Sequence, residues 1–198
     1  MESSEKSRWQ VIREEIDERR RDRAHDIQTV KNIVIRRLKR LADGRHCSPN
    51  AIGWLQHRRT GKATKIDLKR GDGSDSWGHA ALVLRGMEHL EDGALLTVSI
   101  DIDERHREIV SYSISVVGAR RPEPSTEERP APRPFYIRVD LDDEPKGKGL
   151  CGHPLLHCHV GDLAGQSRAF SPRIPLPWLP PGDALDMILA NVHPPLEP

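Results

Sequence analysis

Several features that would place the chain in a membrane or secreted class are missing. No run of apolar residues approaches the ~18–20 that a membrane span needs, and the opening "MESSEKSRWQ" has no apolar signal core. The three cysteines are an odd number with no C-x-x-C pair, which argues against a disulfide framework or a cysteine-pair metal site. We therefore expect a cytoplasmic protein with reduced thiols and no membrane partner.

Aromatic residues and net charge are also scarce. Aromatic residues make up 4% of the chain and hydrophobic residues 36%, while 31% are charged and the formal net charge is only +1. No overall field therefore draws the protein to nucleic acid, although residues 1–46 and 51–73 each carry a basic excess. The lean apolar content predicts one domain with solvated additions rather than a large core.

The first pattern present is that of a helix. Apolar residues recur at three- and four-residue steps between Ile27 and Leu41, so the sequence predicts one long helix over residues 9–42. We expect residues 1–45 to form a charged helical arm. Its charged side is either a solvated face or a contact surface for a protein partner or nucleic acid.

Residues 46–198 have the patterns of an α+β domain. Strict alternation in "LLTVSIDID" and "IVSYSISVV" predicts a hairpin, and "FYIRVDLDD" and "HPLLHCHVG" predict two further strands. The proline-rich segment 118–134 predicts a disordered loop, and a last helix begins near Pro181. The predicted fold is a long N-terminal helix, a four-stranded antiparallel meander, and a C-terminal helix packed on the sheet.

The histidine-rich strand has two distinct sides. Alternation places His157 and His159 on one face, and Cys158 on the other with Leu156 and Val160. Since the apolar side should face the core, we expect Cys158 to be buried and unreactive.

The preceding strand supplies partners for these histidines. If the two strands pair antiparallel, Arg138 and Asp140 project outward beside His157 and His159, with opposed Cβ atoms ~5 Å apart. One interpretation is a divalent-metal site of His157 and His159 with His153 or Asp140 as third ligand. A second is metal-free acid–base catalysis of RNA cleavage, and a third is a purely structural polar face.

A resemblance adds to this pattern in the C-terminal half. The segments "FYIRVDLD", "GHPLLHCHVG" and "SPRIPLPWLPPGDALDMILANV" resemble an uncharacterised bacterial defence-associated family with an R-x-D, H-P-x-x-H-x-H, R-x-P pattern. The region is also similar, more loosely, to TumE-type toxins of toxin–antitoxin pairs. The resemblance covers about residues 95–192. It implies genes near mobile elements or defence loci, a nucleic-acid target, and the recurrent polar positions Arg138, Asp140, His153, His157, His159 and Arg173.

The expected function is a phage-defence or toxin–antitoxin component that acts on nucleic acid, with RNA as the first expected target, as in a ribonuclease-type toxin. In that role His157 and His159 are the acid–base or metal-binding pair, Asp140 orients a histidine, and Arg138 and Arg173 bind substrate. One alternative is a non-enzymatic adaptor or antitoxin-like subunit that binds a protein partner through the N-terminal helix. Another alternative is a ubiquitin-conjugating-like fold, which the "HP" pair, the cysteine downstream of it and the "WLP" segment resemble.

Overall fold

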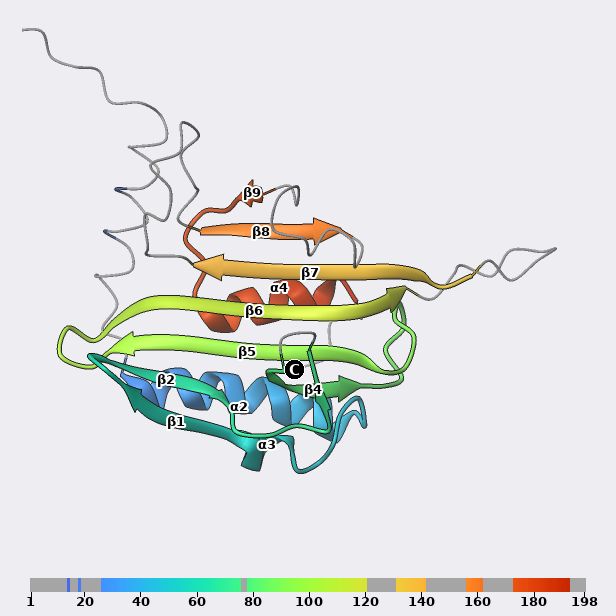
Figure 1. The fold of residues 1–198 in the computed structure, drawn as a ribbon, viewed down its shortest axis with the longest axis horizontal. Helices are drawn as coiled ribbons and strands as arrows, with labels where there is room; N and C mark the ends of the chain where they lie inside the picture. The colour runs from blue at the N-terminus through green and yellow to red at the C-terminus, as the bar shows by residue number, and fades with distance from the viewer. Residues whose placement is uncertain are drawn as a thin grey trace, which may run out of the picture.

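The computed structural model is dominated by one large antiparallel sheet (Figure 1). It describes Glu14 and Glu18 and residues 26–75, 78–120, 131–141, 156–161 and 173–192. Over these residues the sheet has nine strands, so the predicted four-stranded meander with a long N-terminal helix is wrong. The strands are β1 (Leu55–Thr60), β2 (Ala63–Leu68), β3 (Gly73–Ser74), β4 (Ala80–Leu84), β5 (Ala94–Asp103), β6 (Glu108–Arg120), β7 (Arg133–Leu141), β8 (Leu156–Gly161) and β9 (Arg173–Pro175).

The strand order is β1-β2-β5-β6-β7-β8-β9, and every pairing is antiparallel. The four strands read from the sequence are β5 to β8, at the centre of this order. β2 pairs with residues 99–102 of β5, whereas β4 pairs with residues 94–96 of the same strand and carries β3 on its other side. The extra strands β1 to β4 are short and separated by glycine-containing turns, so their sequences carry a weak strand signal.

Three helices accompany the sheet over the described residues: α2 (Ile27–Asp43), α3 (Ala51–Trp54) and α4 (Pro181–Ala190). Asp26 has an extended backbone, and its side chain accepts a hydrogen bond from the Thr29 backbone N–H at 2.7 Å, so α2 begins at residue 27. The prediction of one helix over 9–42 is therefore wrong, because the helix is interrupted at its N-cap. Upstream, only Glu14 and Glu18 are described, and both are helical.

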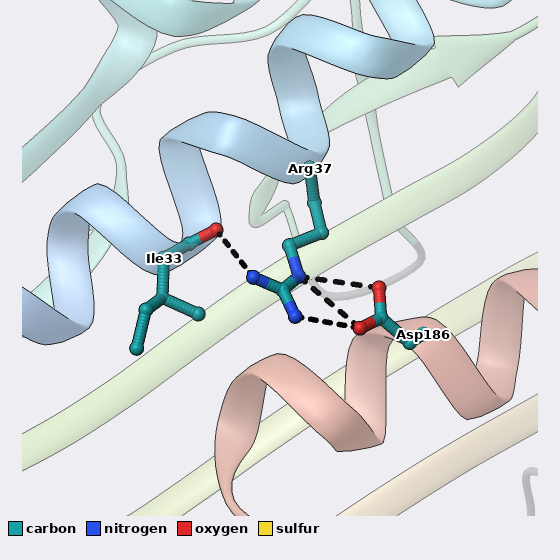
Figure 2. Close-up of polar contacts among 3 residues, drawn as sticks. All are labelled: Ile33, Arg37 and Asp186. Carbon is teal, nitrogen blue, oxygen red and sulfur yellow. Dashed lines mark hydrogen bonds and ion pairs between the residues drawn. The ribbon is translucent and has the colours of Figure 1, made fainter. Parts of the chain in front are cut away.

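Helices α2 and α4 lie on the same face of the sheet and pack against each other (Figure 1). Figure 2 shows the polar contact between them, in which the Arg37 guanidinium donates from Nη2 to Asp186 Oδ2 at 2.6 Å and from Nε to both carboxylate oxygens at 3.2 Å. The same guanidinium donates to the Ile33 carbonyl at 3.4 Å. Gly182 permits the close approach, since a Cβ there would lie 2.4 Å from Ile33 Cγ2.

The core lies between this helical layer and the inward face of the sheet. Every second residue of β5 is buried from Ala94 to Ile102, which follows from the two-residue side-chain period of a strand. α2 contributes its stripe from Val30 to Leu41, and α4 contributes Leu185 among others. No helix in the described part of the chain is long and apolar enough to cross a membrane.

The predicted proline-rich loop over 118–134 is shorter at both ends than expected. β6 continues to Arg120 and β7 begins at Arg133, and these two residues are paired across the strands. The Arg120 guanidinium lies over the Phe135 ring at 4.8 Å, a cation–π contact at this end of the hairpin. Residues 121–130 lie outside the described part of the chain.

Candidate metal centre

The register between β7 and β8 brings the predicted polar residues together. Arg138 is paired with His159 and Asp140 with His157; the sequence predicted the shared face of these four residues but not this register. Side chains of directly paired residues project to the same face, so all four stand on one side of the sheet. β9 adds Arg173 opposite His159 on the same face.

The four groups on β7 and β8 meet at one carboxylate oxygen. Asp140 Oδ2 lies 3.4 Å from His159 Nε2, 3.8 Å from His157 Nε2 and 2.6 Å from Arg138 Nε. The two imidazole rings contact each other edge to face, with centroids 4.7 Å apart. The arrangement is thus a compact cluster and not a row of separate surface groups.

The two histidines are less exposed to solvent than we expect for residues that project outward from the sheet. His157 and His159 are only 1% and 4% exposed, so the expectation of a solvated face is wrong at these positions. Helices α2 and α4 cover the opposite face of the sheet (Figure 1), where Cys158 packs into the core. The Arg138 side chain, 29% exposed, is the member of the cluster most open to solvent.

Asp140 is held in its anionic form by its neighbours. Burial alone would raise the pKa of this carboxyl, but hydrogen bonds from His159 and Ser113 and the charges of Arg138 and His157 outweigh burial and bring the pKa below its usual value. A carboxylate at neutral pH is the form that binds a cation.

Three donors of the cluster fit a metal ion. The ligand atoms of Asp140, His157 and His159 lie within 4.8 Å of one another, and two imidazoles with one carboxylate are a common donor set for zinc and related ions. Metal–ligand bonds of ~2.0–2.1 Å place tetrahedral ligand atoms roughly 3.3 Å apart. The 3.4 Å between Asp140 Oδ2 and His159 Nε2 matches this spacing, and His157 Nε2, at 3.8 Å, would have to move closer to the carboxylate. This buried group can therefore hold a metal ion. His153, the other predicted ligand, lies outside the described residues.

Sequence reasoning predicted the strand β6 but missed that its serines support the site. Ser113 is paired with Asp140 and hydrogen-bonds its carboxylate, while Ser115 is paired with Arg138 and bonds the Thr97 hydroxyl at 2.7 Å. The signal was present in the alternating serines of "IVSYSISVV", which share the polar face with the R-x-D motif once β6 and β7 pair. Ser113 thus fixes the carboxylate from the side opposite the histidines.

Cys158 lies on the core side of β8, as predicted. It is 5% exposed, and burial together with the charge of Asp140 raises the pKa of its thiol to about 11. A protonated, buried thiol is a poor nucleophile. The exposed cysteine that a ubiquitin-conjugating site requires is therefore not found at this position.

Comparisons with protein-family models, with curated protein sequences and with solved structures gave no match for this chain. The candidate site consequently rests on its own geometry.

Proposed function

We propose that the protein binds one divalent metal ion of the zinc class through Asp140, His157 and His159, and uses it to hydrolyse phosphodiester bonds in nucleic acid, with RNA as the expected substrate. The observation that carries the metal centre is the convergence of two imidazoles on the same oxygen of an anionic carboxylate. When bound, such an ion supplies an activated water at neutral pH.

The geometry favours a metal centre over metal-free acid–base catalysis. A general acid and a general base must each reach the substrate, usually on different sides of the scissile bond. Here both imidazole Nε2 atoms face the same Asp140 oxygen, so they are not placed on different sides of a scissile bond. Grouping around one point suits coordination better than two separate proton transfers.

The remaining polar residues have roles on the protein side of the reaction. Asp140 supplies the negative charge, and Ser113 holds that carboxylate in place. Arg138 and Arg173 carry positive charge on the same face and suit the phosphate groups of a nucleic acid. The two arginines and the R-x-D, H-x-H resemblance support a nucleic-acid substrate as part of this proposal. The defence or toxin–antitoxin setting is proposed from the resemblance.

The non-enzymatic adaptor is the second proposal, and it differs in what it requires. It would use residues 1–45, predicted from the sequence to form a helical arm; within this range α2 buries its apolar stripe against the sheet and α4. An adaptor needs no metal and no cleavage. Measurements of metal content and of RNA cleavage therefore distinguish the two proposals.

The test is zinc stoichiometry and RNA cleavage by the full chain. After zinc loading and dialysis, the wild-type protein should retain about one zinc per chain, as expected of a three-ligand protein site. His157→Ala and His159→Ala should retain none and cleave no RNA. The control is His106→Ala. His106 is an exposed histidine outside the cluster, and its Nδ1 lies 2.9 Å from Asp103 Oδ2.

Two outcomes would contradict the proposal. A wild-type chain that retains no zinc removes the metal centre. Cleavage that is unchanged in both histidine variants, with circular dichroism confirming their fold, removes the catalytic role.

A further inference from the structure

We infer that Arg138 and the metal ion compete for one oxygen of Asp140, and that metal loading releases the Arg138 guanidinium to form, with Arg173, a site for a phosphate group. This inference rests on the proposed metal centre and adds the substrate group and the order in which the site assembles.

The competition follows from the shared atom. Arg138 Nε lies 2.6 Å from Asp140 Oδ2, the same oxygen that both imidazole Nε2 atoms approach. Without a metal, the guanidinium is the cation that balances this carboxylate. A divalent ion among the same three donors would repel the guanidinium and take its place on the oxygen.

The Arg138 side chain can leave Asp140 for solvent once it is displaced. Its side chain is 29% exposed, compared with 14% for Asp140, so the guanidinium is the part of the cluster that can turn toward solvent. The carboxylate keeps its hydrogen bond from Ser113, which holds it in place during the exchange.

The released guanidinium faces a second arginine across β8. Arg138 and Arg173 are each paired with His159 from opposite sides, so their backbones stand two strand spacings, roughly 9–10 Å, apart on one face. Arg173 is exposed and has no carboxylate within ion-pair distance in the described part of the chain. Two long side chains that start from either side of His159 on one face can reach one tetrahedral oxyanion and bind it with several charge-assisted hydrogen bonds.

The first arm of the test measures zinc affinity by competition with a chromophoric chelator. Removing the competing cation in Arg138→Gln should tighten zinc binding by about tenfold, from the loss of one unit charge next to the site. Arg58→Gln is the matched control, because Arg58 also pairs with an aspartate, Asp67 at 3.0 Å, but at the far edge of the sheet. Its zinc affinity should equal that of the wild type.

The second arm measures anion binding by calorimetry, with inorganic phosphate and with a dinucleoside monophosphate that has no terminal phosphate. Protein loaded with one equivalent of zinc should bind at least one of these two anions roughly tenfold more tightly than zinc-free protein does. By linkage, that anion should increase the affinity of the protein for zinc by the same factor. Binding of both probes indicates an internal phosphodiester, and binding of inorganic phosphate alone indicates a terminal phosphate. In Arg138→Gln and in Arg173→Gln, zinc loading should no longer increase the affinity for the anion.

The outcomes separate the inference from the function on which it rests. Zinc affinity that is unchanged or weaker in Arg138→Gln overturns the competition while leaving the metal centre intact. A zinc-dependent gain in anion affinity that persists in Arg138→Gln means that the anion binds the metal directly, which overturns the arginine site. A wild-type chain that binds no zinc overturns both proposals.

Discussion

At the scale of the residue, the candidate site depends on one carboxylate that several neighbours keep ionised. Asp140 is nearly buried, and a buried carboxylate without partners would take up a proton. Its hydrogen bonds from His159 and Ser113 and the adjacent Arg138 prevent this. The R-x-D and H-x-H motifs made the cluster predictable, because two-residue periodicity fixes the face of each side chain.

A pH-dependent contribution to stability follows from the lowered pKa of Asp140. Because the carboxyl has a lower pKa folded than unfolded, it stabilises the fold above the unfolded value near 3.9 and loses this contribution as the pH falls through the folded pKa. Asp140→Asn should therefore lower the free energy of unfolding at pH 7 by about 1–3 kcal/mol, and by less at pH 3. Urea denaturation at both pH values in the absence of metal measures the difference. An equal loss at the two pH values would contradict the ionised carboxylate.

At the scale of the element, the two helices that cover the sheet have boundaries and contacts set by single residues. Asp26 starts α2 by capping its first turn, and Gly182 lets α4 approach Ile33. The apolar stripe predicted the helix between Ile27 and Leu41. It did not predict the break at Asp26, since charged residues continue the helical composition upstream while an N-cap depends on one local hydrogen bond.

The close contact between α2 and α4 at Gly182 predicts that adding one methyl group there lowers the stability of the fold. In Gly182→Ala the new Cβ would lie 2.4 Å from Ile33 Cγ2, so α2 or α4 must shift, and the free energy of unfolding should fall by about 1–3 kcal/mol. Gly53→Ala is the control, because it lies in α3 with no atom within 4 Å of the added Cβ. Urea unfolding should show it unchanged or slightly more stable. A stable Gly182→Ala chain would mean that the helices are not closely packed.

The N-cap predicts a graded response at residue 26. Asp26→Ala should lower the helical circular dichroism signal and the Tm, because the Thr29 backbone N–H loses its acceptor. Asp26→Ser keeps a capping oxygen and should retain most of both. Equal loss in the two variants would show that the effect is not capping.

At the scale of the whole molecule, the protein is a nine-stranded sheet with helices on one face and a polar cluster on the other, within the described residues. The central strands β5 to β7 were predictable because they run over nine or more residues with largely alternating apolar positions, and the six-residue β8 was recognised from its H-x-H pattern. The outer strands β1 to β4 and β9 were not predicted, since β3 and β9 have only two or three residues, and β1 and β2 are rich in charged and polar side chains next to glycine-containing turns. The burial of His157 and His159 was also beyond the sequence, because alternation gives the direction of a side chain and not what covers it.

The central claim is that Asp140, His157 and His159 bind one metal ion, and zinc X-ray absorption of the loaded full chain tests it most directly. The account predicts two imidazole nitrogens and oxygen donors at about 2.0–2.1 Å, and loss of this spectrum in His157→Ala and His159→Ala. A sulfur ligand at about 2.3 Å, or the same spectrum in both variants, would contradict it.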